Sequence, residues 1–190
     1  MAADALGLGG GKLAALSPQA MQQLQAALPA TWSQGNPVDI IGDASVSRHV
    51  SALQTLLADQ TNGANDAILF MHVPTAIVSS TAIAHACAPL AKGRRVLACW
   101  LGADAVAEAR RIFEAQDIPC YDTPEHAVNA YLQLAAYRRN QQMLMQTPPS
   151  VPRDFVPDAA AAGRVVSSAL SAGREWLTEA DTRSVLAAYG

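Results

Sequence analysis

This 190-residue sequence lacks several of the signatures by which common active sites are recognised. It contains no GxxxxGKS/T phosphate-binding loop, and its early run of glycines does not follow a predicted strand, as a dinucleotide-binding turn would. Its three cysteines lie far apart without a CxxC pair, so neither a zinc site nor a disulfide framework is supported, and we expect no metal. The four histidines do not cluster, and no spacing typical of nucleophilic catalysis is present. We therefore expect no catalytic residue in this chain by itself.

The sequence also lacks the features of membrane and nucleic-acid proteins. No apolar run is long enough to span a bilayer, and the first residues contain no basic segment typical of a signal peptide. A net charge of -3 gives no reason to expect a nucleic-acid or membrane partner. We expect a cytoplasmic protein with reduced thiols. Aromatic residues are few (5%), yet 51% of the residues are hydrophobic, which is enough for the core of one domain with closely packed helices.

The stretch 67–73 organises the rest of the chain. It is almost entirely apolar and is typical of a buried strand in a parallel sheet, while the apolar spacing becomes helical from about Ser79. Ser79, Ser80 and Thr81 are good N-cap residues, so a helix is predicted to begin there. Such a helix directs free N–H groups and the positive end of its dipole into the crevice where open α/β sheets bind ligands. An anion is expected near residues 74–81, and an ordinary crossover that binds nothing is the alternative. His72 ends the strand, as a structural or a catalytic histidine.

The order of predicted elements indicates an α/β fold. Strands at 67–73, 95–102 and 118–121 alternate with helices in units of about thirty residues, which predicts a doubly wound parallel sheet in a three-layer αβα arrangement. We expect the crossover helices on the two faces of the sheet, a short edge strand at 12–16, and Asp104 as a helix cap. In the loop at 32–43, Asn36 and Asp39 flank Pro37 and are expected to hold the loop through side-chain bonds to the backbone.

The carboxyl-terminal part differs in composition from the rest. Prolines are frequent at 147–157, which predicts an extended linker after a domain at 1–146. Two short helices are predicted within 158–190, capped by Asp158 and Thr178. Two helices are too few to bury a core of their own, so we interpret this part as a helical tail leading into a further domain.

Several motifs resemble one enzyme family in their order and spacing. The sequence WSQGNPVDIIGDA at 32–44 resembles the Asn-Pro-Val-Asp loop of the NDP-forming acyl-CoA synthetases, the succinyl-CoA synthetase superfamily. The motifs VPTA at 73–76, WLG at 100–102, IPCYDTPEHAV at 118–128 and YRRNQ at 137–141 continue the resemblance. Together with TPPS at 147–150, the longer motifs resemble bacterial fusions of this synthetase to a GNAT acetyltransferase, which are protein lysine acetyltransferases.

The resemblance implies a piece of a larger enzyme. It implies a flavodoxin-like ligase domain that corresponds to the carboxyl-terminal domain of the succinyl-CoA synthetase β subunit, with its first strand missing before Met1. The tail at 158–190 resembles the start of an ATP-grasp domain that is otherwise missing. The implied partners are the CoA-binding, ATP-grasp and GNAT domains of the same polypeptide and the protein substrates of the acetyltransferase, with a homo-oligomer left open. The implied cofactors belong to the parent protein: ATP or ADP, Mg, and CoA or acetyl-CoA.

The resemblance also gives roles to residues at the predicted helix start. It implies that Pro74, Thr75, Ala76, Ser79 and Ser80 face phosphate, mostly through backbone N–H groups, where a phosphohistidine is formed in the superfamily. The β-subunit version of this turn has glycines, which this sequence does not supply. The first hypothesis is therefore a domain that helps to form the phosphohistidine site. The second is a catalytically silent regulatory or assembly module that senses acyl-CoA for the acetyltransferase, and the third is an unrelated flavodoxin-like module that binds flavin.

Overall fold

The computed structural model describes residues 1–59, 67–146 and 156–190. The chain divides into two compact units, Met1–Met143 and Leu144–Gly190, and each is described by itself. Most of the predicted proline-rich linker, residues 147–155, lies outside the described residues. Within the described ranges, no helix is both long and apolar enough to cross a membrane.

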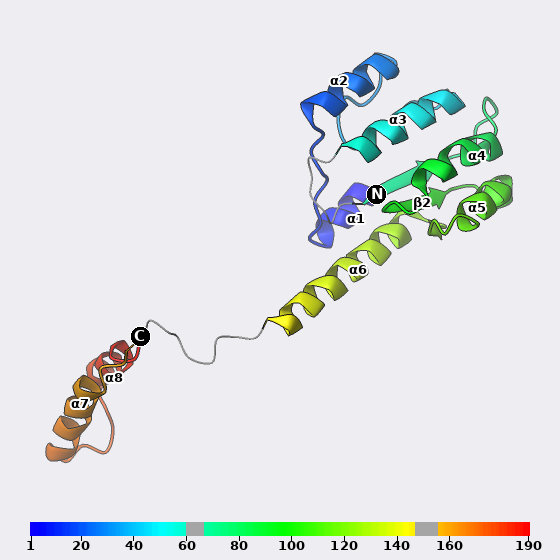
Figure 1. Ribbon diagram of the computed structural model, residues 1–190. Coiled ribbons are helices and arrows are strands. Elements are labelled where there is room, and N and C mark those ends of the chain that lie inside the picture. Colours follow the sequence, from blue (N-terminus) through cyan, green and yellow to red (C-terminus); the bar gives the residue numbers. More distant parts are fainter. Residues whose placement is uncertain (60–66, 147–155) are drawn as a thin grey trace. The chain divides into compact units, whose positions relative to one another are not determined.

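The first unit is built on a parallel sheet of three strands, β1 (Ile68–His72), β2 (Val96–Trp100) and β3 (Cys120–Tyr121). The strands follow one another in the order β1-β2-β3, with Ile68 opposite Val96 and His72 opposite Trp100 (Figure 1). The predicted parallel α/β fold is thus confirmed. Among the described residues β1 pairs only with β2, so β1 forms one edge of this sheet.

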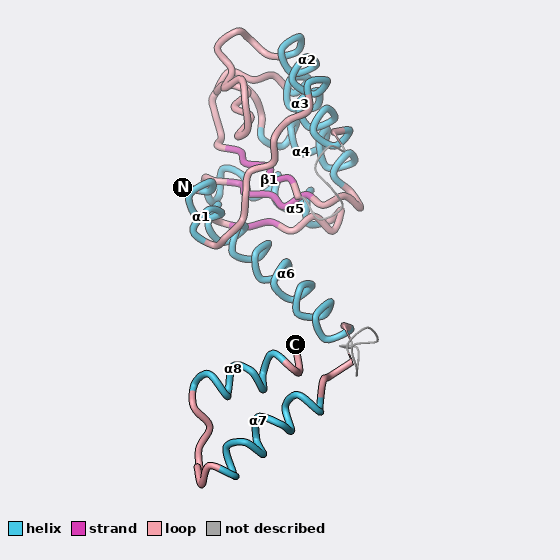
Figure 2. Tube along the Cα trace, turned by 90° about the vertical axis from the view of Figure 1, so that its left-hand side faces the viewer, coloured by secondary structure: helices cyan, strands magenta, loops and turns pink. Residues whose placement is uncertain are grey.

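Helices α4 (Ser80–Ala91) and α5 (Ala107–Glu114) connect consecutive strands and pack against each other on one face of the sheet. The prediction that crossover helices lie on the two faces is wrong for this pair. A right-handed crossover places its helix on a given side, and the side changes only where the strand order reverses, which does not happen between β1 and β3. Beside α4 lies α3 (Val46–Ala58), and α2 (Pro18–Ala27) packs on α3 (Figure 2).

The other face of the sheet is covered by α1 (Ala2–Leu8) and the beginning of α6 (Pro124–Met145). Cys99 points to this face and is fully buried, and Ala127 in the first turns of α6 is buried as well. The end of α1 lies against α6, since a Cβ on Gly9 would be 2.2 Å from the side chain of Leu132. With helices on both sides of the sheet, the three-layer arrangement is confirmed.

Alternation along the strands fills the larger core. Phe70 of β1 and Trp100 of β2 face α3–α5, where their rings meet each other and Phe113 of α5 with centroid separations of 5.0–5.5 Å. Alanines on the inner faces of α4 and α5 let these helices approach the sheet and each other closely. These fully buried small residues are Ala84, Ala88, Ala91 and Ala109. A smaller core lies between α2, the loop that follows α2, and α3, around Leu24, Leu28 and Trp32.

Side chains cap most of the described helices. In six of them an N-cap side chain accepts the N–H of the residue three positions on, and these caps are Ser17, Ser45, Ser79, Thr123, Asp158 and Thr178. The caps of α4, α7 and α8 are those that the sequence predicts. Asp104 does not cap a helix: it lies within the 3₁₀ turn η1 (Ala103–Val106), and α5 follows that turn. Residues 12–16 form no strand, and the amide of Asn36 donates to the Ala14 carbonyl instead (2.8 Å).

The second unit consists of α7 (Ala159–Ser171) and α8 (Glu179–Ala187), which pack on each other. Thr178 and Asp181 form a capping box, and Arg174 contacts the Asp181 carboxylate at 2.5 Å. The hydrogen bonds from Arg174 and Thr178 lower the pKa of Asp181 to about 2. Only two alanines of these helices are buried, whereas Leu170, Trp176 and Leu186 are exposed. This unit therefore has caps and an ion pair but little core.

We expect burial to decide the cost of shortening isoleucines on either side of the α4 start. Ile83 is 1% exposed and Ile77 is 67% exposed. Ile83→Ala should lower the free energy of unfolding by about 2–5 kcal/mol, because it removes buried methylenes and leaves a cavity. Ile77→Ala should change it by less than about 0.5 kcal/mol. Urea titration followed by the fluorescence of the buried Trp32 and Trp100 measures both, and equal effects would contradict the assigned burial.

Candidate anion site at the start of helix α4

Seven residues, 73–79, connect β1 to α4 and contain most of the predicted site residues. Thr75, Ala76 and Ser79 are exposed, and Pro74 is half-buried. The Ser79 hydroxyl accepts the Ala82 N–H (3.3 Å), and the Thr75 hydroxyl accepts the Ile77 N–H (3.4 Å). These side-chain bonds fix the loop and leave its backbone accessible.

The first amides of α4 are the groups that suit an anion. Ser80 and Thr81 occupy the first two positions of the helix, where an N–H has no intrahelical acceptor. Within residues 1–59, 67–146 and 156–190, neither N–H meets another acceptor. Two free donors at the positive end of a twelve-residue helix form the local geometry that binds phosphate and carboxylate groups in other proteins.

The hydroxyl of Ser80 points away from this exposed region. It lies 2.9 Å from Nε2 of His72, and the two residues are 8% and 6% exposed. The side chain of Ser80 therefore belongs to the interior, and only its backbone N–H is left to contact an anion. His72 is a buried, hydrogen-bonded histidine, and its partner Ser80 is the first residue of the helix at which the anion is predicted.

Two rings surround the His72 imidazole. The Trp100 ring lies with its centroid 5.0 Å from that of His72, and the His49 ring of α3 lies at 5.8 Å. Burial lowers the pKa of His72 to about 4, and the neighbouring His49 contributes to the same direction. Burial lowers the pKa of His49 as well. Both imidazoles are consequently neutral near pH 7, so neither adds a positive charge to the site.

The turn after β2 supports the other side of the loop. The Leu101 N–H donates to the His72 carbonyl (2.9 Å), which extends the β1–β2 pairing by one residue. Gly102 follows with a φ of +117°, and a Cβ at this position would lie 2.8 Å from Cγ of Pro74. Glycine is required here both by the backbone angle and by the contact. The glycine of the WLG motif thereby lets the turn after β2 approach Pro74 closely.

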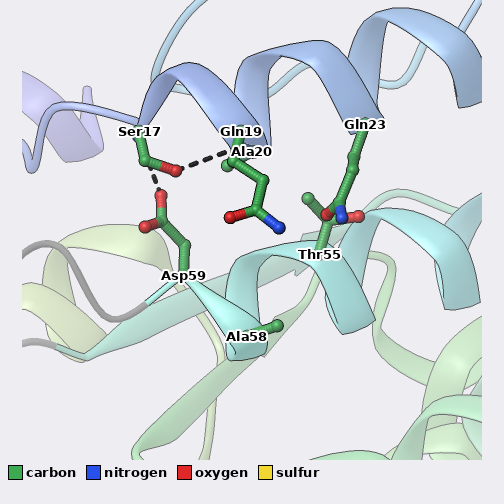
Figure 3. A pocket seen from close by; sticks show the side chains of 7 residues that line it. All are labelled: Ser17, Gln19, Ala20, Gln23, Thr55, Ala58 and Asp59. Atoms are coloured by element: carbon green, nitrogen blue, oxygen red, sulfur yellow. Dashed lines mark hydrogen bonds between the residues drawn. The ribbon is translucent and has the colours of Figure 1, made fainter.

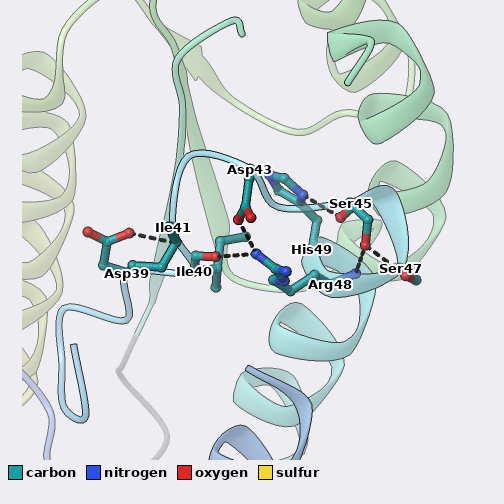
Figure 4. Close-up of polar contacts among 8 residues, drawn as sticks. All are labelled: Asp39, Ile40, Ile41, Asp43, Ser45, Ser47, Arg48 and His49. Carbon is teal, nitrogen blue, oxygen red and sulfur yellow. Dashed lines mark hydrogen bonds and ion pairs between the residues drawn. The ribbon is translucent and has the colours of Figure 1, made fainter. Parts of the chain in front are cut away.

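The Asn-Pro-Val-Asp loop is tied together by side chains that bond the backbone. The Ser33 hydroxyl donates to the Pro37 carbonyl (2.7 Å) and accepts the Asp39 N–H (2.9 Å). Asp39 in turn accepts the Ile41 N–H (2.9 Å), as Figure 4 shows. Ile41 has a φ of 69°, which is costly for a β-branched residue, so the surrounding bonds must hold it there.

Arg48 connects this loop to the start of α3. Its guanidinium donates to the Ile40 carbonyl (3.2 Å) and to the Asp43 carboxylate (2.6 Å), as drawn in Figure 4. His49, one residue further on, contacts His72, so the first turns of α3 and α4 both lie at the carboxyl end of β1. The sequence patterns did not single out Arg48 or His49, which follow the α3 cap Ser45 by three and four residues.

A separate polar cavity of about 460 Å³ lies between α2 and α3 (Figure 3). The Asp59 carboxylate accepts the Ser17 N–H (2.9 Å), and the Ser17 hydroxyl accepts the Ala20 N–H (3.0 Å). These bonds join the end of α3 to the start of α2. The cavity is lined by residues of these two helices and their caps, none of which belongs to the α4 loop: Ser17, Gln19, Ala20, Gln23, Thr55, Ala58 and Asp59.

The described residues give no support to metal binding or to cysteine-based catalysis. In the part of the chain that the structure describes, no group of three metal-ligating side chains comes together. Cys87, Cys99 and Cys120 are free thiols. Burial raises the pKa of Cys87 and of Cys120 to about 11, so both are protonated near neutral pH and are poor nucleophiles.

Known proteins match this chain in sequence. An acetate–CoA ligase (ADP-forming) of Archaeoglobus fulgidus is 34% identical over 139 residues, which are 73% of this chain and 19% of that protein. The chain is homologous to the ligase domain of the ADP-forming acetyl-CoA synthetases. A 4-hydroxybutyrate–CoA ligase (ADP-forming) of Nitrosopumilus maritimus is 26% identical over 171 residues, or 89% of this chain and 24% of that protein. No protein-family model matches the chain.

Solved structures share the fold. The acetyl-coenzyme A synthetase 1 of Candidatus Korarchaeum cryptofilum, in its apo form, is 26% identical with a TM-score of 0.65, covering 76% of this chain and 32% of that one. A Pyrococcus horikoshii protein is 28% identical with a TM-score of 0.64, covering 73% and 33%. The Korarchaeum enzyme in complex with phosphate and ADP is 24% identical with a TM-score of 0.66, covering 77% and 32%.

The chain spans about a fifth to a quarter of the length of the curated relatives it matches. The likeness to several ADP-forming synthetases confirms the flavodoxin-like, succinyl-CoA synthetase-type fold that the motifs imply.

Replacing Gly102 of this synthetase-like domain should displace Pro74. Gly102→Ala adds a Cβ 2.8 Å from Pro74, whereas Gly93→Ala adds one with nothing within 4 Å, and both glycines have positive φ. Backbone strain alone should cost Gly93→Ala about 1–2 kcal/mol of unfolding free energy. Gly102→Ala should cost about 1–3 kcal/mol more, because the contact adds overpacking. Chemical denaturation compares the two variants. Equal losses of unfolding free energy would show that Pro74 can move away from the added Cβ at no cost.

Acid should destabilise the domain through His72. The folded-state pKa of about 4 lies below the 6.5 of a free histidine, so the unfolded chain binds one more proton between these values. The unfolding free energy should therefore be unaffected by His72 above about pH 6.5 and should fall by about 3 kcal/mol as the pH drops to 4. In His72→Gln this contribution is absent. Denaturation from pH 7 to 4 measures the difference, and parallel curves would contradict the depressed pKa of His72.

Proposed function

We propose that this domain helps to form the phosphate site of a larger acyl-CoA synthetase-like protein, between its CoA-binding and nucleotide-binding modules. The observation that carries the proposal is the α4 start, where the Ser80 and Thr81 N–H groups have no acceptor among the described residues. The exposed residues Thr75, Ala76 and Ser79 and the half-buried Pro74 lie in the loop before these amides. A phosphoryl group, such as that of a phosphohistidine on another domain, is the ligand that this geometry favours.

The domain does not supply the reactive group in this proposal. The described histidines that lie near the site have partners within the domain. His72 is buried and bonds Ser80, and the half-buried His49 bonds the Ser45 carbonyl and lies against the His72 ring. The role of the chain is instead to present fixed dipoles to a negative charge brought by a partner domain, which stabilises the charge without reorganisation. ATP or ADP, Mg and CoA would bind to the other modules of the parent protein.

The relatives support the phosphate proposal and bear on the acyl group. The Archaeoglobus and Nitrosopumilus ligases are both ADP-forming but act on different acids, acetate and 4-hydroxybutyrate. A domain shared by both is better suited to the common phosphoryl step than to acyl selection. The Korarchaeum synthetase has been solved with phosphate and ADP. We further propose, from the YRRNQ and TPPS motifs, that the parent protein carries a GNAT acetyltransferase that modifies protein lysines.

Phosphate titration of the isotope-labelled 190-residue chain tests the proposal. We expect saturable shifts of the Ala76, Ser80 and Thr81 amide signals with inorganic phosphate, beyond those caused by sodium chloride at equal ionic strength. Thr81→Asp should weaken binding at least about tenfold, since it places a carboxylate beside the anion while suiting the helix dipole. Gln19→Asp makes the same change at the second position of α2 and should leave the phosphate affinity unchanged.

Two results would overturn the phosphate proposal: no saturable shift in the wild-type chain, or equal binding by Thr81→Asp. A parallel titration with acetyl-CoA separates the alternative. Saturable shifts with acetyl-CoA and none with phosphate would favour a catalytically silent module that senses acyl-CoA for the acetyltransferase.

A further inference from the structure

The loop that carries the anion-facing residues is spanned by a buried hydrogen bond. His72 is the last residue of β1 and Ser80 is the first residue of α4, and their side chains meet at 2.9 Å. Between them lie seven residues, of which Val73 and Ile77 are 60% and 67% exposed. The hydrogen bond between His72 and Ser80 therefore ties the two ends of this loop together in the interior.

His72 is itself held in one orientation. Trp100 and His49 lie against its ring, with centroids at 5.0 and 5.8 Å, and only 6% of the residue is exposed. The Leu101 N–H bonds its carbonyl at 2.9 Å. A side chain fixed by packing and by the sheet can transmit its position to the group it bonds.

Ser80 transmits that position to the start of the helix. Its hydroxyl is directed inward to His72, while its N–H is the first of the two free amides of α4. Ser79, next to it, closes the first turn by accepting the Ala82 N–H on its hydroxyl and the Ile83 N–H on its carbonyl (3.1 Å). Because Ser80 carries both the hydroxyl that bonds His72 and the first free N–H, the His72–Ser80 bond helps to set the direction of the free amides.

We propose that His72 is a positioning residue that orients the first turn of α4 through Ser80, and thereby sets the anion affinity of this turn. The proposal rests on the proposed phosphate function for its consequence, but the positioning itself is a property of the fold. His72 does not touch the anion. An unpaired hydroxyl or imidazole in this interior would be costly, so loss of either partner should loosen the turn.

Hydrogen exchange tests the positioning without any ligand. His72→Leu and Ser80→Ala should each speed exchange of the Ala82 and Ile83 amides about fivefold relative to Ala88 in the middle of α4, as expected for one hydrogen bond. Because both variants remove the same bond, the double variant should be no worse than the more severe single one. His72→Gln keeps a hydrogen-bonding group near the Nε2 position and should restore most of the protection.

Phosphate titration of the same variants tests the consequence. The dissociation constant should rise about fivefold in His72→Leu and in Ser80→Ala, without adding in the double variant, and should return toward the wild-type value in His72→Gln. If the wild-type chain binds no phosphate, the proposed function fails while the exchange experiment still decides the role of His72. Additive effects, equal acceleration at Ile83 and Ala88, or no rescue by glutamine would overturn the positioning role. If His72→Leu does not fold, Ser80→Ala is compared with the double variant Ser80→Ala, His72→Gln, which again shows whether the effects of the two positions add.

Discussion

The buried face of β1 is the constraint on which the candidate site depends. Phe70 and His72 are two residues apart and therefore point to the same face of the strand. Phe70 packs into the aromatic cluster, and His72 packs against Trp100 at the carboxyl end of the strand. Once His72 is fixed, Ser80 must lie within hydrogen-bond distance of it, so the chain has seven residues in which to leave the sheet and begin α4. The register with β2 adds the WLG turn, whose Gly102 approaches Pro74. The anion-facing backbone is thus a consequence of how the core is filled.

Two polar networks, one buried and one at the surface, support the same edge of the sheet. One consists of His72 and Ser80 below the α4 start. The other consists of Asp39, Asp43 and Arg48, which hold the Asn-Pro-Val-Asp loop and the start of α3. His49 links them through its contact with His72. Both networks hold the chain around the site through hydrogen bonds, while the first two amides of α4 have no acceptor among the described residues. A surface of this kind is suited to a charge carried in by another domain.

Local patterns predicted the elements well because local chemistry decides them. The strand at 67–73 and the caps Ser79, Asp158 and Thr178 each depend on a few neighbouring residues, and all occur where expected. Errors arose where distant residues compete. Residues 12–16 have an apolar pattern, but Asn36 bonds the Ala14 carbonyl. Asp104 was expected to cap a helix, yet the chain turns at Gly102, next to Pro74, and Asp104 lies inside the 3₁₀ turn that follows.

The sequence by itself determined the βα alternation, the helix start at Ser79 and Ser80, and through its motifs the kinship with acyl-CoA synthetases, because these depend on residues close in the chain or on order along it. Tertiary structure decided that α4 and α5 share one face, since that follows from strand order rather than from any local pattern. It also decided that His49, His72, Ser80 and Trp100 come together, because four side chains from different elements meet only when the sheet and helices pack. The free amides at the start of α4 could be inferred from the sequence, but the side-chain contacts beneath them, between His72, Ser80 and Trp100, could not.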